Sequence, residues 1–250
     1  YALFPTNHWR ECVRDALSVS AIKEWATDQL DYDDPLLIEQ IQTRSLPRRG
    51  IWAKPDQILI TVGAQQALYI GILTTLSPEQ TLLMEDPGYV QMKKVLELSR
   101  INYQTVNVEP ETGLNIEAVL QQSGNAIYIT PSNQYPLGTS LNTEQRLALI
   151  EWAQQHNSWI FEDDYDSEFQ FAHRPYTSLQ GLASQSGAAE RCIYIGTFSK
   201  TLFNAMRIGY MVVPAHLVNQ CLTIKDAISG DTPTHIQAAL ADFINEGSYL

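Results

Sequence analysis

Long apolar runs, cysteines and basic residues are all scarce in this sequence of 250 residues. No run of about eighteen apolar residues occurs, which excludes a transmembrane helix. The first six residues show no basic segment followed by an apolar one, so no signal peptide is visible and we expect a cytoplasmic protein. The three cysteines are scattered and the five histidines show no ligand spacing. We therefore expect reduced structural thiols and no metal site.

The scarcity of positive charge bears on nucleic-acid binding. Lysine and arginine number 16 against 28 aspartates and glutamates, for a formal net charge of −12. Proteins bind nucleic acids largely by neutralising phosphates with basic side chains. An acidic chain without a basic stripe is therefore a poor candidate for touching DNA itself. No G-x-G-x-x-G turn follows a strand either, which argues against a dinucleotide-binding protein.

The chain alternates between short apolar segments and helical patterns. We predict strands at 58–62, 81–85, 103–108, 126–130, 159–161, 192–195 and 209–213. We predict helices at 65–76, 89–99, 116–122 and 143–156, the last with Thr143 as its N-cap. This order predicts a three-layer α/β/α fold with a mostly parallel sheet. Residues 1–50 are expected to form an arm and one helix, 51–250 the α/β domain, and 184–190 a mobile loop.

A lysine close to the end of a predicted strand is the most informative residue. Lys200 lies in GTFSKTLFNAMRIGY at 196–210, after the strand at 192–195, with Ser199 before it and Arg207 seven residues later. A buried lysine of lowered pKa condenses readily with an aldehyde, and hydroxyl and guanidinium groups bind phosphate. Pyridoxal phosphate carries both an aldehyde and a phosphate. A Ser-Lys pair alone usually marks a surface loop, so the role of Lys200 has to be inferred from the other motifs as well.

A dense group of carboxylates follows another strand, in EDDYDSEF at 162–169. A carboxylate there can pair with a protonated pyridine nitrogen, and the Tyr165 hydroxyl can bond the phenolic oxygen of the ring. Adjacent side chains point to opposite sides of a strand, so only one of Asp163 and Asp164 can face the ring. The remaining carboxylates of the segment are interpreted as capping or surface groups: Glu162, Asp166 and Glu168.

Three more segments follow strands in the same way: VGAQQAL at 62–68, EDPGY at 85–89 and TPSNQYPLG at 130–138. The first combines a glycine turn with a helix start, whose backbone N–H groups can bind phosphate. Ligands of parallel sheets bind beyond the carboxyl ends of the strands, where all these segments fall.

Taken in their order along the chain, the five segments resemble the aspartate-aminotransferase fold (fold type I) of pyridoxal-phosphate proteins. More narrowly, they are similar to the aminotransferase-like domain of MocR-type transcriptional regulators, a branch of the GntR family. The resemblance spans about Trp9 to Tyr210. It implies a pyridoxal-phosphate-binding large domain, with a winged helix-turn-helix before residue 1 and a small domain after residue 250.

The resemblance also implies site residues. The catalytic group would be Lys200 as an internal aldimine, Asp163 on the pyridinium nitrogen and Tyr165 on the phenolic oxygen. Tyr89 would stack on the cofactor ring, and Asn133 stands where the family often has histidine. Tyr32 matches a tyrosine that reaches a phosphate across a dimer interface. The remaining cofactor-binding residues are Ala64, Gln65, Ser199 and Arg207.

The function implied is an effector-sensing domain of a DNA-binding regulator, homodimeric and responsive to an amino compound or to the cofactor, with weak or vestigial transaminase activity. The alternative is a free-standing class I/II aminotransferase, since a sensor and an enzyme need the same lysine, aspartate and stacking ring. The residues of the segments EDDYDSEF and GTFSKTLF resemble those of the regulators and differ from the usual sequence of the enzymes, which favours the regulator.

Overall fold

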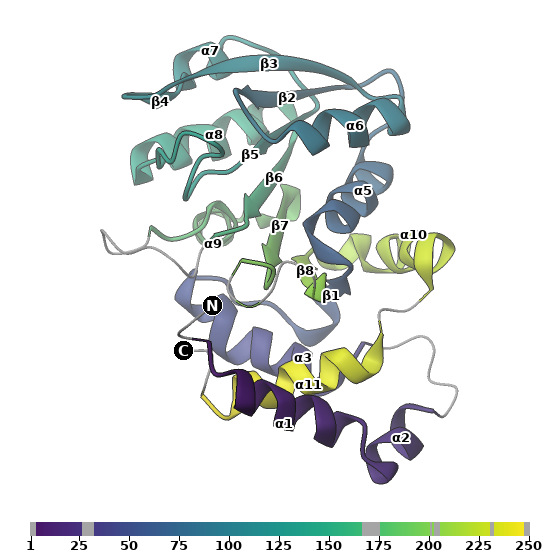
Figure 1. The fold of residues 1–250 in the computed structure, drawn as a ribbon. Coiled ribbons are helices and arrows are strands. Elements are labelled where there is room, and N and C mark those ends of the chain that lie inside the picture. Colours follow the sequence, from purple (N-terminus) through teal and green to yellow (C-terminus); the bar gives the residue numbers. More distant parts are fainter. Residues whose placement is uncertain are drawn as a thin grey trace.

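The computed structural model describes residues 4–26, 33–166, 176–200, 202, 206–230 and 233–247. Its described strands form one sheet with the order β1-β8-β7-β6-β5-β2-β3-β4 (Figure 1). The strands are β1 (Ile58–Thr61), β2 (Thr81–Asp86), β3 (Asn102–Glu109), β4 (Gly113–Leu114), β5 (Ala126–Ile129), β6 (Trp159–Asp164), β7 (Cys192–Thr197) and β8 (Gly209–Val212). The five central strands, β7, β6, β5, β2 and β3, run parallel to one another. At the edges, β4 pairs antiparallel with β3, and β8 pairs antiparallel with both β7 and β1. The predicted α/β fold with a mostly parallel sheet is confirmed.

Helices cover both faces of this sheet. The helices of its two layers are α5 (Gly63–Thr75), α6 (Val90–Ser99), α7 (Ile116–Leu120), α8 (Thr143–His156), α9 (Leu179–Gln185) and α10 (Val218–Ser229). One buried cluster joins the sheet to α5, α6 and α10, and a second joins it to α7, α8 and α9. Because both faces are covered, the central strands carry buried apolar residues on both sides, as in the fully buried β5.

A further group of helices packs near β1 and β8. It comprises α1 (Thr6–Ala16), α2 (Val19–Trp25), α3 (Pro35–Gln40), a π-helical turn (Ile41–Ser45), α4 (Leu46–Arg48) and α11 (Thr234–Asn245). Figure 1 shows α1 and α11 side by side. A third buried cluster joins these helices to the sheet, with Phe243 among its members. The expectation of an arm and one helix before residue 50 is therefore wrong, because several short helices bury apolar faces there.

Two local predictions also need correction. The N-cap of α8 is Asn142, not Thr143, because the Asn142 side chain accepts from the Gln145 backbone N–H in a reciprocal capping box. The segment 184–190 is only partly a loop, since α9 runs to Gln185 and a 3₁₀ turn begins at Ala189. None of the described helices combines the length and the apolar composition that a membrane span requires.

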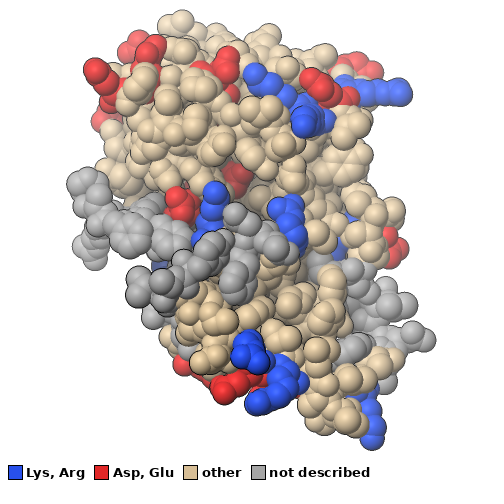
Figure 2. All heavy atoms as spheres, viewed as in Figure 1, with Lys and Arg blue, Asp and Glu red and all other residues tan. Residues whose placement is uncertain are grey.

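Charged side chains are spread thinly over the face that Figure 2 shows. Figure 2 shows basic groups scattered singly or in small groups among acidic and uncharged ones, with no continuous basic patch on the face in view. This distribution agrees with the acidic balance of the sequence.

Candidate functional site

A cavity of about 260 Å³ lies at the carboxyl ends of the central strands. Most of the residues singled out from the sequence line it. Its lining consists of Ala64, Gln65, Tyr89, Tyr128, Thr130, Tyr135, Asp163, Tyr165, Thr197, Ser199, Lys200 and Arg207. Two predicted residues are not in this lining. Asn133 donates to Asp166 Oδ2 at 2.8 Å, and Tyr32 lies outside the described residues.

Asp163, near the end of β6, is the buried carboxylate of the cavity. Its Oδ2 accepts a hydrogen bond of 2.8 Å from the Tyr128 hydroxyl, and its Oδ1 has no partner among the described residues. Burial raises the pKa of Asp163 to about 7, with the Tyr128 hydrogen bond opposing the rise and the charge of Asp164 adding to it. The cavity therefore contains a carboxylate oxygen that can accept one more hydrogen bond.

Asp164 lies on the other side of β6, as expected for adjacent strand residues. Its Oδ2 is 2.6 Å from Arg49 Nε and also accepts from the Tyr194 hydroxyl at 2.6 Å. Arg49 is itself buried and donates to Ser132 Oγ. This ion pair ties the residue after α4 to β6 and to the segment after β5, and it leaves Asp163 as the carboxylate that faces the cavity.

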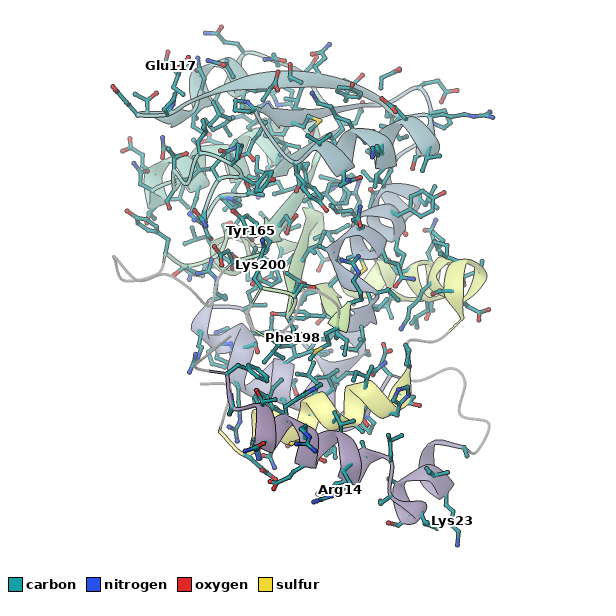
Figure 3. All side chains as sticks on the ribbon, viewed as in Figure 1. Arg14, Lys23, Glu117, Tyr165, Phe198 and Lys200 are labelled. Atoms are coloured by element: carbon teal, nitrogen blue, oxygen red, sulfur yellow. The ribbon has the colours of Figure 1, made fainter. Side chains whose placement is uncertain are left out.

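The turn after β7 brings Ser199 and Lys200 to the cavity. Ser199 Oγ is buried without a hydrogen-bond partner among the described residues, and the Ser199 N–H donates to Thr197 Oγ1. Lys200 is exposed, so the expectation of a buried lysine is wrong. Its side chain lines the rim, where Figure 3 shows it beside Tyr165.

The start of α5 and Arg207 meet at another part of the lining. Arg207 Nη2 lies 3.4 Å from Gln65 Oε1, and no side chain caps the first turn of α5. Gly63 has φ +72°, and a Cβ there would stand 2.9 Å from Arg207 Nη2. Glycine thus allows the guanidinium to lie against the helix start. A guanidinium beside free helical N–H groups is a strong anion-binding arrangement.

A family model described as aminotransferase class I and II matches residues 6–248. The chain belongs to that family. Among its curated relatives, the HTH-type transcriptional regulator TauR of Rhodobacter capsulatus is 36% identical over 247 residues, covering 99% of this chain and 50% of that protein. The uncharacterized HTH-type transcriptional regulator YdeL of Bacillus subtilis is 33% identical over 248 residues, covering 98% of this chain and 52% of that protein. The chain spans about half the length of the curated relatives it matches.

Solved structures show the same fold. A Thermus thermophilus α-aminoadipate aminotransferase, complexed with N-(5'-phosphopyridoxyl)-L-leucine, superposes with a TM-score of 0.85 at 24% identity, covering 98% of this chain and 62% of that chain. A Pyrococcus horikoshii kynurenine aminotransferase, in complex with PMP, superposes with a TM-score of 0.83 at 25% identity, covering 98% of this chain and 61% of that chain. The predicted fold type I architecture is confirmed.

In this member of the aminotransferase class I and II family, three tyrosines form one wall of the cavity. Tyr89 and Tyr165 were predicted from the sequence, and Tyr135 was not. Tyr135 stands edge-on to both Tyr89 and Tyr165, with ring centroids 6.0 Å apart in each pair. Burial and the nearby Asp166 carboxylate raise the pKa of Tyr165, so its hydroxyl stays protonated and can donate. The lining residues missed were Tyr128, Thr130, Tyr135 and Thr197. Tyr128 and Thr130 were detectable, because they lie two positions apart, on the same side of the strand that leads into the motif at 130–138.

Two other carboxylates of these motifs, Glu162 and Glu85, accept hydrogen bonds that hold neighbouring segments of the fold together. Glu162 is fully buried and accepts from the backbone N–H groups of Leu179 and Gln180, so it caps α9 as expected but is not a surface group. Glu85 is also buried and accepts from the Thr130 N–H and hydroxyl; burial raises the pKa of Glu85 to about 7. Glu168 lies outside the described residues.

Proposed function

We propose that this chain is the pyridoxal-phosphate-binding, effector-sensing domain of a MocR-type regulator of the GntR superfamily. The support comes from the aminotransferase family match and from curated relatives whose names describe HTH-type regulators about twice the length of this chain. DNA binding would belong to a winged helix-turn-helix outside the 250 residues, because these carry a net charge of −12.

The observation that carries the cofactor proposal is the set of unpartnered polar groups around one cavity. Asp163 Oδ1 and Ser199 Oγ are buried without hydrogen-bond partners among the described residues, and Arg207 lies against an uncapped helix start. A protonated pyridine nitrogen and a phosphate would supply the missing partners. When bound, pyridoxal phosphate supplies an aldehyde that condenses with an amine and a ring that withdraws electrons.

In this proposal each residue acts at a stated atom. Asp163 Oδ1 accepts the ring N–H, which keeps the ring protonated and Asp163 ionised. Lys200 Nζ is the amine that reaches the aldehyde, and the Tyr165 hydroxyl donates to the phenolic oxygen. Tyr89 stacks on the ring face. The phosphate is held by the backbone N–H groups of Ala64 and Gln65, by Ser199 Oγ and by Arg207.

Two further assignments rest on the resemblance. Asn133 would lie near the phenolic oxygen of the cofactor ring, held in place by the hydrogen bond that it donates to Asp166. Tyr32 would reach the phosphate of a second copy in a cytoplasmic homodimer, since fold type I proteins assemble in this way. The effector would be an amino compound or the cofactor itself. A free-standing aminotransferase is the second candidate, because the superposed structures are aminotransferases and the proposed residues would serve either function.

The cofactor proposal is tested by the visible absorption of the protein after incubation with pyridoxal phosphate. The wild type should develop an absorption band in the violet, and Lys200→Ala should lose it because no other amine lines the cavity among the described residues. Lys54→Ala, which alters an exposed lysine outside the cavity, is the matched control and should keep the band. An equally intense band in Lys200→Ala would exclude Lys200 as the amine.

A further inference from the structure

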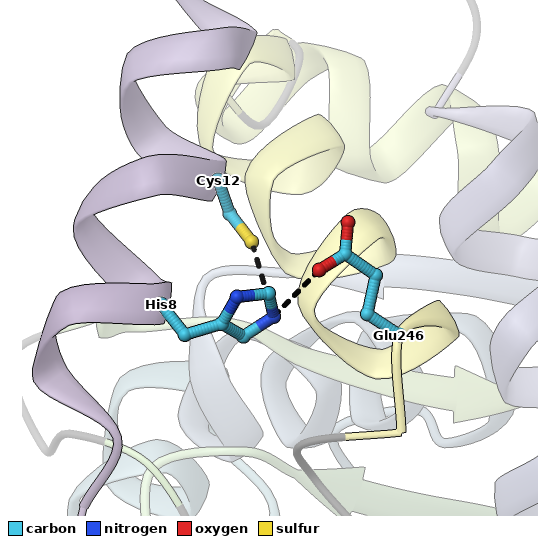
Figure 4. A group of neighbouring side chains, drawn as sticks. All are labelled: His8, Cys12 and Glu246. Atoms are coloured by element: carbon cyan, nitrogen blue, oxygen red, sulfur yellow. Dashed lines mark hydrogen bonds and ion pairs between the residues drawn. The ribbon is translucent and has the colours of Figure 1, made fainter.

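A second group of chemically reactive side chains lies away from the cavity, between α1 and α11 (Figure 4). His8 and Cys12 are one helical turn apart on α1, and Glu246 caps the end of α11. One ligand atom from each residue lies within 4.8 Å of the other two. An imidazole, a thiol and a carboxylate therefore point to a common centre from two elements far apart in the sequence.

The separations suit a small divalent ion. His8 Nε2 is 3.8 Å from Cys12 Sγ and 2.8 Å from Glu246 Oε2. Ligand atoms about 2.0–2.3 Å from a tetrahedral zinc ion stand roughly 3.3–3.6 Å from one another. The nitrogen and sulfur, 3.8 Å apart, must approach each other slightly, and the carboxylate oxygen must withdraw by about half an ångström. The side chain of Glu246 is 57% exposed, so it is free to make that adjustment.

The His8 ring is oriented from both sides. It stacks on Phe243, with ring centroids 5.4 Å apart, and its Nδ1 lies 3.9 Å from Glu11 Oε2. Histidines that bind metal through one nitrogen commonly direct the other N–H to a carboxylate, which fixes the tautomer. Here Nδ1 and Glu11 Oε2 are too far apart for a hydrogen bond, so Glu11 would have to move closer to act in this way, whereas Nε2 lies near Cys12 and Glu246.

The surroundings of Cys12 favour a cation. Cys12 is buried, and Glu246, Asp242 and Asp15 all contribute negative potential at its thiol. A divalent ion would relieve the repulsion and stabilise the thiolate.

We propose that His8, Cys12 and Glu246 bind one Zn²⁺ ion, with water as the fourth ligand. Nitrogen, thiolate sulfur and carboxylate oxygen are the donors that zinc takes in proteins. On binding, the S–H bond of Cys12 breaks, an S–Zn bond forms, and the thiol proton leaves to solvent. The proton that His8 Nε2 shares with Glu246 moves through solvent to Nδ1, so that Nε2 can bind the ion; no electrons are transferred. The ion would link α1 to the end of α11. The sequence predicted no metal site, because the spacing of His8 and Cys12 is the only local sign of this one.

The experiment uses tag-free protein, stripped of metal and titrated with Co²⁺, whose bond to a thiolate gives a charge-transfer band in the near ultraviolet. The wild type should show this band at one Co²⁺ per chain and lose it when Zn²⁺ is added. Cys12→Ser should abolish the band.

Two surface variants keep the test independent of folding defects. Glu246→Gln removes a ligand at a half-exposed position and should weaken affinity by more than tenfold while circular dichroism stays unchanged. His216→Gln is the matched control, since His216 also pairs with a carboxylate, Glu190, at 3.0 Å. It should bind Co²⁺ as the wild type does. Absence of the band in the wild type, its persistence in Cys12→Ser, or equal weakening in His216→Gln would overturn the proposal.

Discussion

Asp163 and Asp164 are neighbours in the chain, yet their side chains have opposite surroundings. Asp163 lines the cavity and accepts a hydrogen bond from Tyr128, whereas Asp164 is paired with the buried Arg49. The alternation of strand residues predicts that they diverge, but it does not predict which of them faces the cavity. That depends on Arg49, which lies far away in the sequence and meets β6 only in the folded chain. A contact of this kind has no local sequence pattern.

Asp163→Asn should stabilise the cofactor-free protein at high pH. The folded-state pKa of about 7 lies above the ordinary value, so the folded protein favours the protonated form. Stability from this group is present at low pH and is lost as the pH rises through about 7. The variant should therefore exceed the wild type in free energy of unfolding at pH 8, by up to about 4 kcal/mol, with the gap closing toward about pH 4.

Denaturant unfolding of both proteins between pH 4.5 and 8 measures this gap. Asp164→Asn is the matched control: it leaves the buried Arg49 without its carboxylate and should lose about 3–5 kcal/mol at every pH. An Asp163→Asn protein less stable than the wild type at pH 8 would show that Asp163 is ionised and stabilised in the folded state.

At the scale of elements, apolar patterns predict the sheet well and the helices less well. The predicted strands coincide with β1 to β3 and β5 to β8 within a few residues, because strands buried on both faces are continuous apolar runs. Helices α9, α10 and α11 were not predicted. Residues of α11 such as Leu240, Phe243 and Ile244 show helical spacing and were detectable, whereas the short α9 depends on capping by the distant Glu162.

The start of α5 supplies the prediction at this scale. Gly63→Ala should cost roughly 1–2 kcal/mol of stability from its positive φ, and should also displace Arg207. Loss of one charge-assisted hydrogen bond corresponds to about tenfold or more in affinity for pyridoxal phosphate. Gly187→Ala is the control, because Gly187 has φ +74° with nothing within 4 Å of an added Cβ. It should show a similar loss of stability and unchanged affinity, and equal affinities in the two variants would contradict a phosphate site here.

At the scale of the whole molecule, charge decides what these residues bind. A net charge of −12 and scattered basic groups leave little to neutralise a DNA backbone. We expect the 250-residue chain alone to give no sequence-specific shift of DNA in gels at physiological salt. A specific shift that survives unlabelled competitor DNA would contradict the assignment of DNA binding to a separate domain.

The central claim is that Lys200 is the amine that receives pyridoxal phosphate, and covalent mapping tests it most directly. The wild-type protein is incubated with the cofactor, reduced with borohydride, digested and analysed by mass spectrometry. We predict one phosphopyridoxyl group per chain, attached to Lys200, and none in Lys200→Ala. A group attached to a different lysine, or no covalent group in the folded wild type, would contradict the claim.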